Sequence, residues 1–276
     1  STSSSHIYLC VADGVGSWRQ FGVDPRAYSH RLVENARKVI ESDMQHRELI
    51  RHSPFDRDLD AVHPLDVIMD AWNMTNSEGV VGSSTICVAT LDRKLGQLSY
   101  SNIGDCGLLV IRHIDNAQVG YLAKKSFQSN SSAHTAHSDL HIAFLSQQQL
   151  KSFNLPYQLG FTNIENTPNA FESPTDADTA SISVLPGDIV ILATDGLFDN
   201  MEMEEIVAEV ASWEENHSVT EIGVLAEQLV QKARLLSLDK HKDSPFALLA
   251  KENDIMWGGG MPDDTTVVVA RVTTAA

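Results

Sequence analysis

Three times in this chain, a strand-like apolar run meets an aspartate at one of its ends. The three pairs are Ile7–Ala12 with Asp13, Ile189–Thr194 with Asp195, and Thr265–Val269 with Asp263. Each arrangement places a carboxylate at the end of a buried strand, where the scaffold is rigid and solvent begins. Carboxylates that meet there repel one another unless a cation joins them. The pattern therefore predicts strand ends that converge on an acidic site.

The type of ligand narrows the choice of cation. All the candidates are oxygen atoms, which favours a hard ion such as Mg²⁺ or Mn²⁺. A glycine directly after the aspartate, as at Gly14, leaves its own carbonyl open to a metal and lets the chain turn sharply. The alternative interpretation is that Asp-Gly is a common turn dipeptide with no metal role, and a single Asp-Gly does not exclude it.

The remaining apolar runs predict a sheet-rich fold. Runs rich in Ile, Val and Leu predict strands at Ile7–Ala12, Thr85–Leu91, Leu98–Ile103, Gly107–Arg112, Ile182–Leu185, Ile189–Ala193 and Thr266–Val272. The polar segments Lys124–Asp139 and Thr162–Ala180 are predicted to be surface loops, because apolar strands resume after each. We expect one catalytic domain over residues 1–276.

Helical signals fall between groups of strands. Asp24 before Pro25 is typical of an N-cap with proline in the first turn, and apolar residues then recur at helical spacing. Three further helices are predicted, one through Leu65–Trp72, one capped by Asn200, and one through Leu225–Ala233. Because helices do not alternate regularly with strands, we expect an α+β fold with antiparallel sheets and flanking helices.

Charge and cysteine usage exclude several classes of protein. The 276 residues include 20 Lys and Arg against 37 Asp and Glu, a net charge of −17. Such a chain would be repelled by nucleic acid and by anionic membranes. The three cysteines, Cys10, Cys87 and Cys106, have no spacing typical of a disulfide framework or a zinc site, which favours a reducing compartment. No apolar stretch approaches the roughly 20 residues that cross a bilayer.

Five motifs resemble, in order, those of the protein phosphatase type 2C family of metal-dependent serine/threonine phosphatases. They span nearly the whole chain and are VADGVGSW at Val11–Trp18, GSST at Gly82–Thr85, NIGDC at Asn102–Cys106, LATDGLFD at Leu192–Asp199 and PDDTTVV at Pro262–Val268. Two more segments, Phe153–Leu159 and Ser244–Ala247, are similar to the subgroup of phosphatases found in mitochondria and plastids.

The resemblance implies a central sandwich of two antiparallel β-sheets between α-helices, with two metal ions at one end. Asp13 would bridge both ions, and the Gly14 carbonyl would bind one of them. Asp195 and Asp263 would bind the other ion, whereas Asp105 matches a position that we interpret as structural. The implied reaction is hydrolysis of phosphoserine or phosphothreonine on a protein by a metal-activated bridging water.

The sequence departs from the family at two places. The family has an earlier strand that carries an acidic residue and often an arginine, whereas Ser1–His6 contains neither. Either this N-terminal strand is missing by truncation or the second metal site is weak, and a sheet without its edge strand would expose apolar surface. Val15 also stands where many members have a histidine, a difference that the organellar subgroup often shares.

Two classes of function stay open at this stage. The first is an active phosphatase that acts on a phosphoprotein, and the second is a catalytically impaired phosphatase-like domain with a binding or regulatory role. We expect an intracellular protein, organellar in preference to cytoplasmic, and a monomer in preference to an oligomer. Trp18 is predicted either to border the substrate cleft or to pack inside, and Met256–Met261 either to form a rim of the site or to be only a loop.

Overall fold

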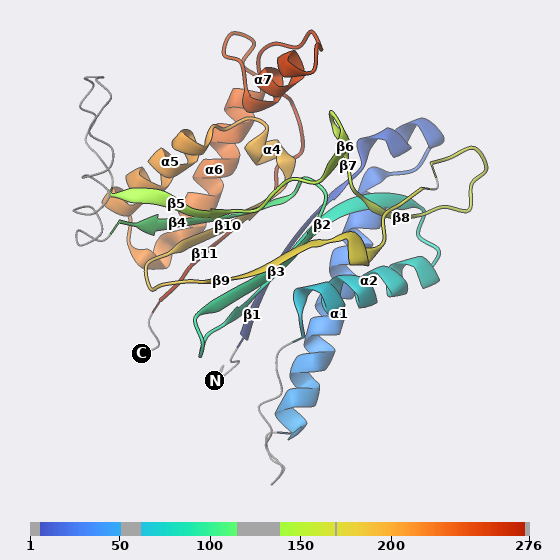
Figure 1. Cartoon of the computed structure of the whole chain (residues 1–276), viewed down its shortest axis with the longest axis horizontal. Coiled ribbons are helices and arrows are strands. Elements are labelled where there is room, and N and C mark those ends of the chain that lie inside the picture. The colour runs from blue at the N-terminus through green and yellow to red at the C-terminus, as the bar shows by residue number, and fades with distance from the viewer. Residues whose placement is uncertain (1–5, 51–61, 115–138, 169, 274–276) are drawn as a thin grey trace.

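The computed structural model describes residues 6–50, 62–114, 139–168 and 170–273 of the chain. Its main body consists of two antiparallel sheets that lie face to face between two pairs of helices (Figure 1). This arrangement confirms the predicted sandwich.

The first sheet has the strand order β1-β2-β3-β9, with β8 also paired to β2. Its strands are β1 (His6–Gly14), β2 (Gly82–Asp92), β3 (Gln97–Ile103), β8 (Leu159–Phe161) and β9 (Asp178–Ser183). β1 is the last strand on its side of this sheet among the described residues.

The second sheet has the order β11-β10-β4-β5. Its strands are β4 (Gly107–His113), β5 (Leu140–Leu145), β10 (Ile189–Ala193) and β11 (Val267–Arg271). A separate pair, β6 (Leu150–Ser152) and β7 (Leu155–Pro156), stands at one end of the sandwich (Figure 1).

Side chains on the central strands point alternately to the space between the two sheets and to the space beneath the helices. On β10, Val190 and Leu192 pack between the two sheets, whereas Ile189 and Ile191 face the outer helices. On β2, Cys87 likewise faces the space between the sheets. Because successive side chains of a strand point to opposite faces, an uninterrupted apolar run fills two layers at once.

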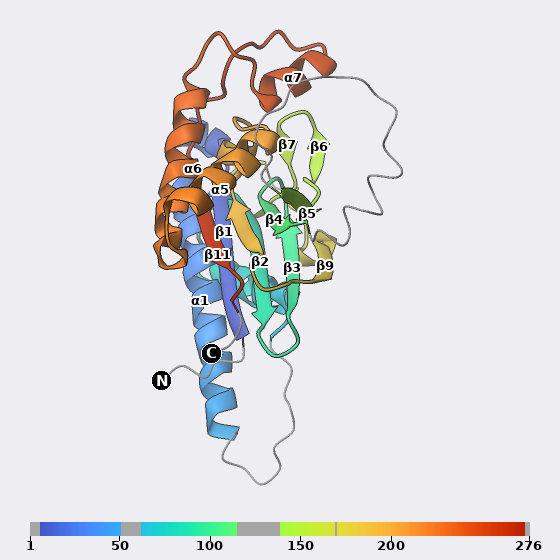
Figure 2. The ribbon, with the colours of Figure 1, turned by 90° about the vertical axis from the view of Figure 1, so that its left-hand side faces the viewer.

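Helices cover both outer faces (Figures 1 and 2). The first sheet is covered by α1 (Pro25–Ile50) and α2 (Pro64–Ser77), and the second by α5 (Met203–Asn216) and α6 (Ile222–Ser237). Two shorter helices, α4 (Asp195–Phe198) and α7 (Pro245–Glu252), and three 3-10 turns, η1 (Gly16–Phe21), η2 (Pro174–Asp176) and η3 (Val219–Glu221), complete the described elements. None of the described helices is long and apolar enough to cross a bilayer.

Most predicted strands are confirmed to within a few residues, but the strand predicted at Ile182–Leu185 lies earlier, as β9. Leu185 instead belongs to the turn before β10, where the Asp188 carboxylate accepts a hydrogen bond from the Leu185 amide at 2.8 Å. The short strands β5 to β8 and the helices α4 and α7 were not predicted.

The prediction that Asn200 caps a helix was wrong. Glu202 caps α5 and forms a capping box with Glu205. The loop predicted over Lys124–Asp139 lies outside the described residues except for Asp139. The segment Thr162–Ala180, of which residue 169 lies outside the described residues, is otherwise irregular apart from η2 and the start of β9.

Candidate metal-binding active site

The ends of three strands meet at one end of the sandwich. β10 ends at Ala193, whose partner on β11 is Val267. Because the two strands run antiparallel, the residues before β11 lie beside those after β10. The Thr194 amide donates a hydrogen bond to the Thr266 carbonyl at 3.1 Å, and the Thr266 amide donates one to Thr194 Oγ1 at 3.0 Å. These contacts bring the loop that carries Asp263 to the start of α4.

Close backbone contacts explain the two glycines of the Asp-Gly pairs. A Cβ atom on Gly196 would lie 2.4 Å from the Asp264 carbonyl oxygen, and one on Gly14 would lie 2.1 Å from the Pro25 carbonyl oxygen. Neither glycine has a positive φ. The requirement at these positions is therefore close packing of neighbouring segments, and not the sharp turn that the sequence suggested.

The three predicted carboxylates share one electrostatic environment. Burial, and then the charges of Asp195 and Asp263, raise the pKa of Asp13 to about 8. Burial and Asp263 raise the pKa of Asp195 to about 6, although a hydrogen bond from Asp13 opposes the shift. The pKa of Asp263 is raised as well, chiefly by burial. Asp13, Asp195 and Asp263 therefore lie together, as predicted.

Two further aspartates belong to the same group, and the sequence reasoning did not place them there. Asp105 is only 6% exposed, and burial together with Asp195 raises its pKa to about 8. Burial and the charges of Asp195, Asp105 and Asp263 raise the pKa of Asp199 well above its usual range. We call these five residues, Asp13, Asp105, Asp195, Asp199 and Asp263, the acidic cluster.

The sequence carried a signal for each added residue. Asp199 follows Asp195 by four positions, the spacing that puts two side chains on one face of a helical turn, and its amide donates to the Asp195 carbonyl at 2.7 Å. Asp105 precedes β4, whose first residue, Gly107, pairs with Ala193 at the end of β10.

The donor set fits a hard divalent cation. Asp195 Oδ1 is buried and has no hydrogen-bond partner, and a buried carboxylate oxygen without a partner is costly unless a ligand satisfies it. The candidate side-chain donors are all carboxylate oxygens, which Mg²⁺ and Mn²⁺ prefer. Among the described residues, no three acidic, His or Cys side chains already stand in a metal-binding arrangement.

A single arginine adds positive charge beside this cluster. Arg19 is exposed on η1, and its charge lowers the pKa of Asp263, against the larger effect of burial. Within the part of the chain that the structure describes, the Arg19 guanidinium has no hydrogen bond or ion pair. It is therefore free to meet an anionic ligand at the edge of the cluster.

Trp18 and Ser83 hold η1 in place. The Trp18 indole is 2% exposed and donates a hydrogen bond from Nε1 to Ser83 Oγ at 2.6 Å. Ser83 Oγ in turn donates to Gln158 Oε1 at 2.5 Å, and the Trp18 ring stacks on Phe171 with 6.3 Å between centroids. Of the two roles left open for Trp18, the packing role is correct.

The segment Met256–Met261 is tied to the cluster by Asn200. Asn200 Nδ2 donates to the Met261 carbonyl and Asn200 Oδ1 accepts from the Met261 amide, both at 2.8 Å. Asn200 directly follows Asp199, and Met261 stands two residues before Asp263. The segment is thus an anchored border of the site at its Met261 end.

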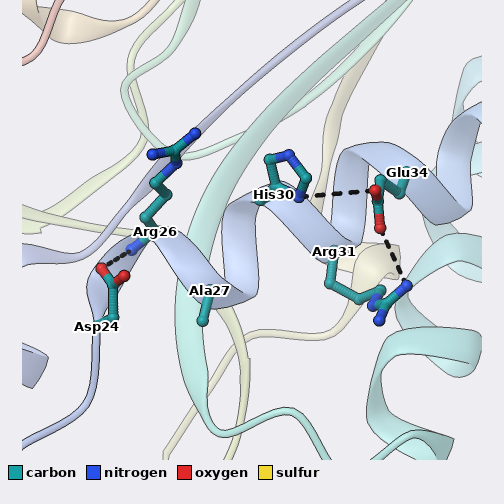
Figure 3. Close-up of a pocket in the computed structure, with 6 residues that line it drawn as sticks. All are labelled: Asp24, Arg26, Ala27, His30, Arg31 and Glu34. Atoms are coloured by element: carbon teal, nitrogen blue, oxygen red, sulfur yellow. Dashed lines mark hydrogen bonds and ion pairs between the residues drawn. The ribbon is translucent and has the colours of Figure 1, made fainter.

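A hollow of about 460 Å³ lies on the first turns of α1 (Figure 3). Its polar groups largely satisfy one another: Arg31 Nη1 donates to Glu34 Oε2 at 3.0 Å, and His30 Nδ1 lies 3.8 Å from Glu34 Oε1. None of the five aspartates lines it, so it is not the candidate active site.

Known proteins resemble this chain along nearly its whole length. The protein phosphatase PTC7 homolog fig of Drosophila grimshawi is 33% identical over 266 residues, which are 95% of this chain and 74% of the relative. The protein phosphatase PTC7 homolog of Homo sapiens is 32% identical over 267 residues, 96% of this chain and 74% of the relative. The chain belongs to the protein phosphatase 2C family. A comparison with models of protein families found no match.

A solved phosphatase of this kind has the same fold. The X-ray structure of the photosystem II phosphatase PBCP matches this chain with a TM-score of 0.69 and 25% identity, over 99% of this chain and 93% of the other. The resemblance stated from the motifs is therefore confirmed, as are the sandwich fold and membership in a family of metal-dependent protein phosphatases.

The crowded cluster predicts an unusual pH dependence for the metal-free protein. Between about pH 5.5 and 8, the folded state holds protons on Asp13 and Asp105 that the unfolded chain has released, because their folded pKa values are raised to about 8. Asp195, with a pKa of about 6, adds to this effect only at the low end of the window. Stability is therefore present at low pH within this window and is lost as pH rises. In EDTA, the Tm of this phosphatase should fall by about 4 °C or more from pH 6 to pH 8, equivalent to about 1–2 kcal/mol in a chain of this size.

In the variant Asp195→Asn, the Tm should fall less steeply with pH, because the substitution removes one of the repelling charges. Asp254→Asn, at an exposed loop residue, is the matched control and should keep the wild-type slope. A Tm that rises with pH over this window would contradict the prediction.

Proposed function

We propose that this phosphatase hydrolyses phosphoserine and phosphothreonine on proteins, with Mg²⁺ or Mn²⁺ bound at the acidic cluster. The observation that carries the proposal is the convergence of Asp13, Asp195 and Asp263 at one end of the sandwich, where Asp195 Oδ1 is buried without a partner. Membership in the protein phosphatase 2C family supports the reaction type.

The resemblance to the family implies a ligand role for each residue, and the proximity of the three carboxylates supports it. Asp13 contacts Asp195, and the charge of Asp263 raises its pKa. Asp13 would bridge two ions, with the Gly14 carbonyl as a further donor to one of them. Asp195 and Asp263, held together by the contact of α4 with the loop before β11, would bind the other ion. When bound, such ions supply an acidified water nucleophile and neutralise charge on the phosphoryl oxygens.

The cysteines are poorly suited to nucleophilic attack. Cys87 and Cys106 are buried and Cys10 is half-buried. Burial raises the pKa of Cys10 to about 12 and raises the pKa values of the other two thiols well above their usual range. Because the thiolate is the reactive form, these residues stay inert at neutral pH, which supports a metal-dependent route.

Several expectations from the sequence remain proposals. We propose one catalytic domain over residues 1–276, a monomer, and an organellar location based on the segments Phe153–Leu159 and Ser244–Ala247. Localisation of the tagged protein by microscopy would test the last of these. Within the described residues, no observation favours the catalytically impaired alternative.

The first test of the proposed function is metal dependence. Purified protein should hydrolyse a phosphothreonine peptide with Mn²⁺ or Mg²⁺ and lose that activity in excess EDTA. Asp195→Asn should lower kcat at least tenfold at saturating metal, because it removes a ligand, while the metal-free variant stays folded by circular dichroism. Full activity in EDTA would refute the proposal, and unchanged turnover of the variant would remove Asp195 from the ligand set.

The second test concerns unequal ion affinities. Asp13, Asp195 and Asp263 can all serve one ion, whereas the other ion would retain chiefly Asp13 and the Gly14 carbonyl. Fewer charged ligands give a weaker site. Calorimetry with Mn²⁺ should therefore resolve one tighter and one weaker ion, and the rate should saturate only at millimolar metal, roughly where sites with few charged ligands bind. Two equally tight sites would contradict this.

The third test concerns Arg19. A phosphate dianion that approaches the acidic cluster is repelled by the carboxylates. The Arg19 guanidinium is unpaired beside Asp263 and would offset part of this repulsion. We expect Arg19→Met to weaken inhibition by inorganic phosphate about tenfold, equivalent to roughly 1.4 kcal/mol. Arg19→Lys should recover part of the loss, since lysine keeps the charge but not the fork of donors.

The control is Arg93→Met, at an exposed arginine in the β2–β3 turn. The β1–β2 pairing places this turn at the His6 end of β1, away from Gly14. An Arg19→Met protein with wild-type phosphate inhibition would refute the assignment without affecting the proposed reaction.

A further inference from the structure

Helix α7 and the loop after it carry a group of exposed apolar side chains. We call this group the apolar rim, and its members are Leu248 (48% exposed), Leu249 (36%), Ile255 (39%), Met256 (101%) and Trp257 (39%). Figures 1 and 2 show α7 at the end of the sandwich, beyond the sheets and near β6 and β7. Single exposed apolar residues are common, but five of them within residues 248–257, on α7 and the loop after it, favour a binding surface.

Aromatic contacts and a hydrogen bond hold the apolar rim in place. Phe246 on the buried face of α7 contacts Phe153 in the β6–β7 turn, with ring centroids 5.1 Å apart, and meets Trp257 edge-on at 5.5 Å. Trp257 Nε1 also donates to the Gly260 carbonyl at 3.3 Å. The packed rings of Phe153, Phe246 and Trp257 thus hold in place the segment that carries the exposed side chains.

The rim is also continuous with the acidic cluster. The Phe246 amide donates to the Asp199 carbonyl at 3.1 Å, and Asn200 holds Met261 through two hydrogen bonds. Met256 and Asp263 are seven residues apart, a separation that an extended chain spans in at most about 25 Å. A peptide with its phosphoryl group at the cluster therefore needs no more than about seven residues to reach the rim.

We propose that the apolar rim binds an apolar side chain of the phosphoprotein substrate, located within about seven residues of the phosphorylated serine or threonine. This inference rests on the proposed function and names the feature of the substrate that the site would select.

The charge of the protein favours this occupant. The phosphoryl group of the substrate is anionic and this chain has a net charge of −17, so long-range electrostatics do not draw the phosphoryl group to the protein. Affinity away from the phosphoryl group must then come from contacts such as apolar burial, at about 25 cal/mol per Å². Met256 suits this role, because a fully exposed, flexible thioether adapts to different partners.

The test uses two phosphothreonine peptides that differ only in having Leu or Ser four residues from the phosphothreonine, and p-nitrophenyl phosphate as a substrate without a peptide. The double variant Leu248→Ser, Met256→Ser should lower kcat/KM for the Leu peptide about five- to tenfold, roughly 1–1.4 kcal/mol. This loss should come from a higher KM for the Leu peptide. The Ser peptide and p-nitrophenyl phosphate should be turned over as by wild type.

The control is Leu95→Ser, which changes a 74% exposed leucine in the β2–β3 turn and should alter no rate. If wild type discriminates neither peptide and the double variant matches it, the inference is overturned. If p-nitrophenyl phosphate turnover falls equally, the rim supports the fold and does not bind substrate. If light scattering finds a wild-type dimer that the variant loses, a second copy occupies the rim. Absence of wild-type activity on all three substrates would instead refute the proposed function.

Discussion

The repulsion among buried carboxylates is the constraint on which the rest of this structure depends. Burial raises the pKa values of all five aspartates, and charges within the acidic cluster raise those of Asp13, Asp105, Asp195 and Asp199 further. Such a cluster opposes folding unless protons or cations neutralise it. The scaffold around it must therefore supply the stability that the cluster itself removes.

The packed layers supply that stability. Central strands such as β10 are apolar on both faces, because each fills the space between the sheets and the space beneath the helices. At Gly14, which ends β1, and at Gly196, in α4 just after β10, backbone contacts are too close for any residue but glycine. A rigid core can thus hold repelling groups in place, and the bordering segments, η1 and the loop after α7, are anchored to it through Ser83 and Asn200.

Sequence patterns predicted the elements that carry long apolar runs. β2, β3, β4, β10 and β11 were found close to their observed bounds, because uninterrupted Ile, Val and Leu runs are the strongest local signal of a buried strand. The strands β5 to β8 escaped prediction because they are short, and β5 and β6 leave many side chains exposed. Asn200 was misassigned because its side-chain amide donates hydrogen bonds to the carbonyls of Gly196 and Met261. Met261 is 61 residues away in the sequence, so no local pattern predicts this contact.

The sequence by itself determined the family, the sandwich of sheets and helices, and the meeting of Asp13, Asp195 and Asp263, because ordered motifs and strand ends are local features. Only the tertiary structure decided that Asp105 and Asp199 join them, that Trp18 packs inside, and that the apolar rim on α7 and the loop after it lies next to the acidic cluster. Each of these depends on which segments become neighbours in space. Strand register and helix packing determine those neighbours, and neither can be read from local residue patterns alone.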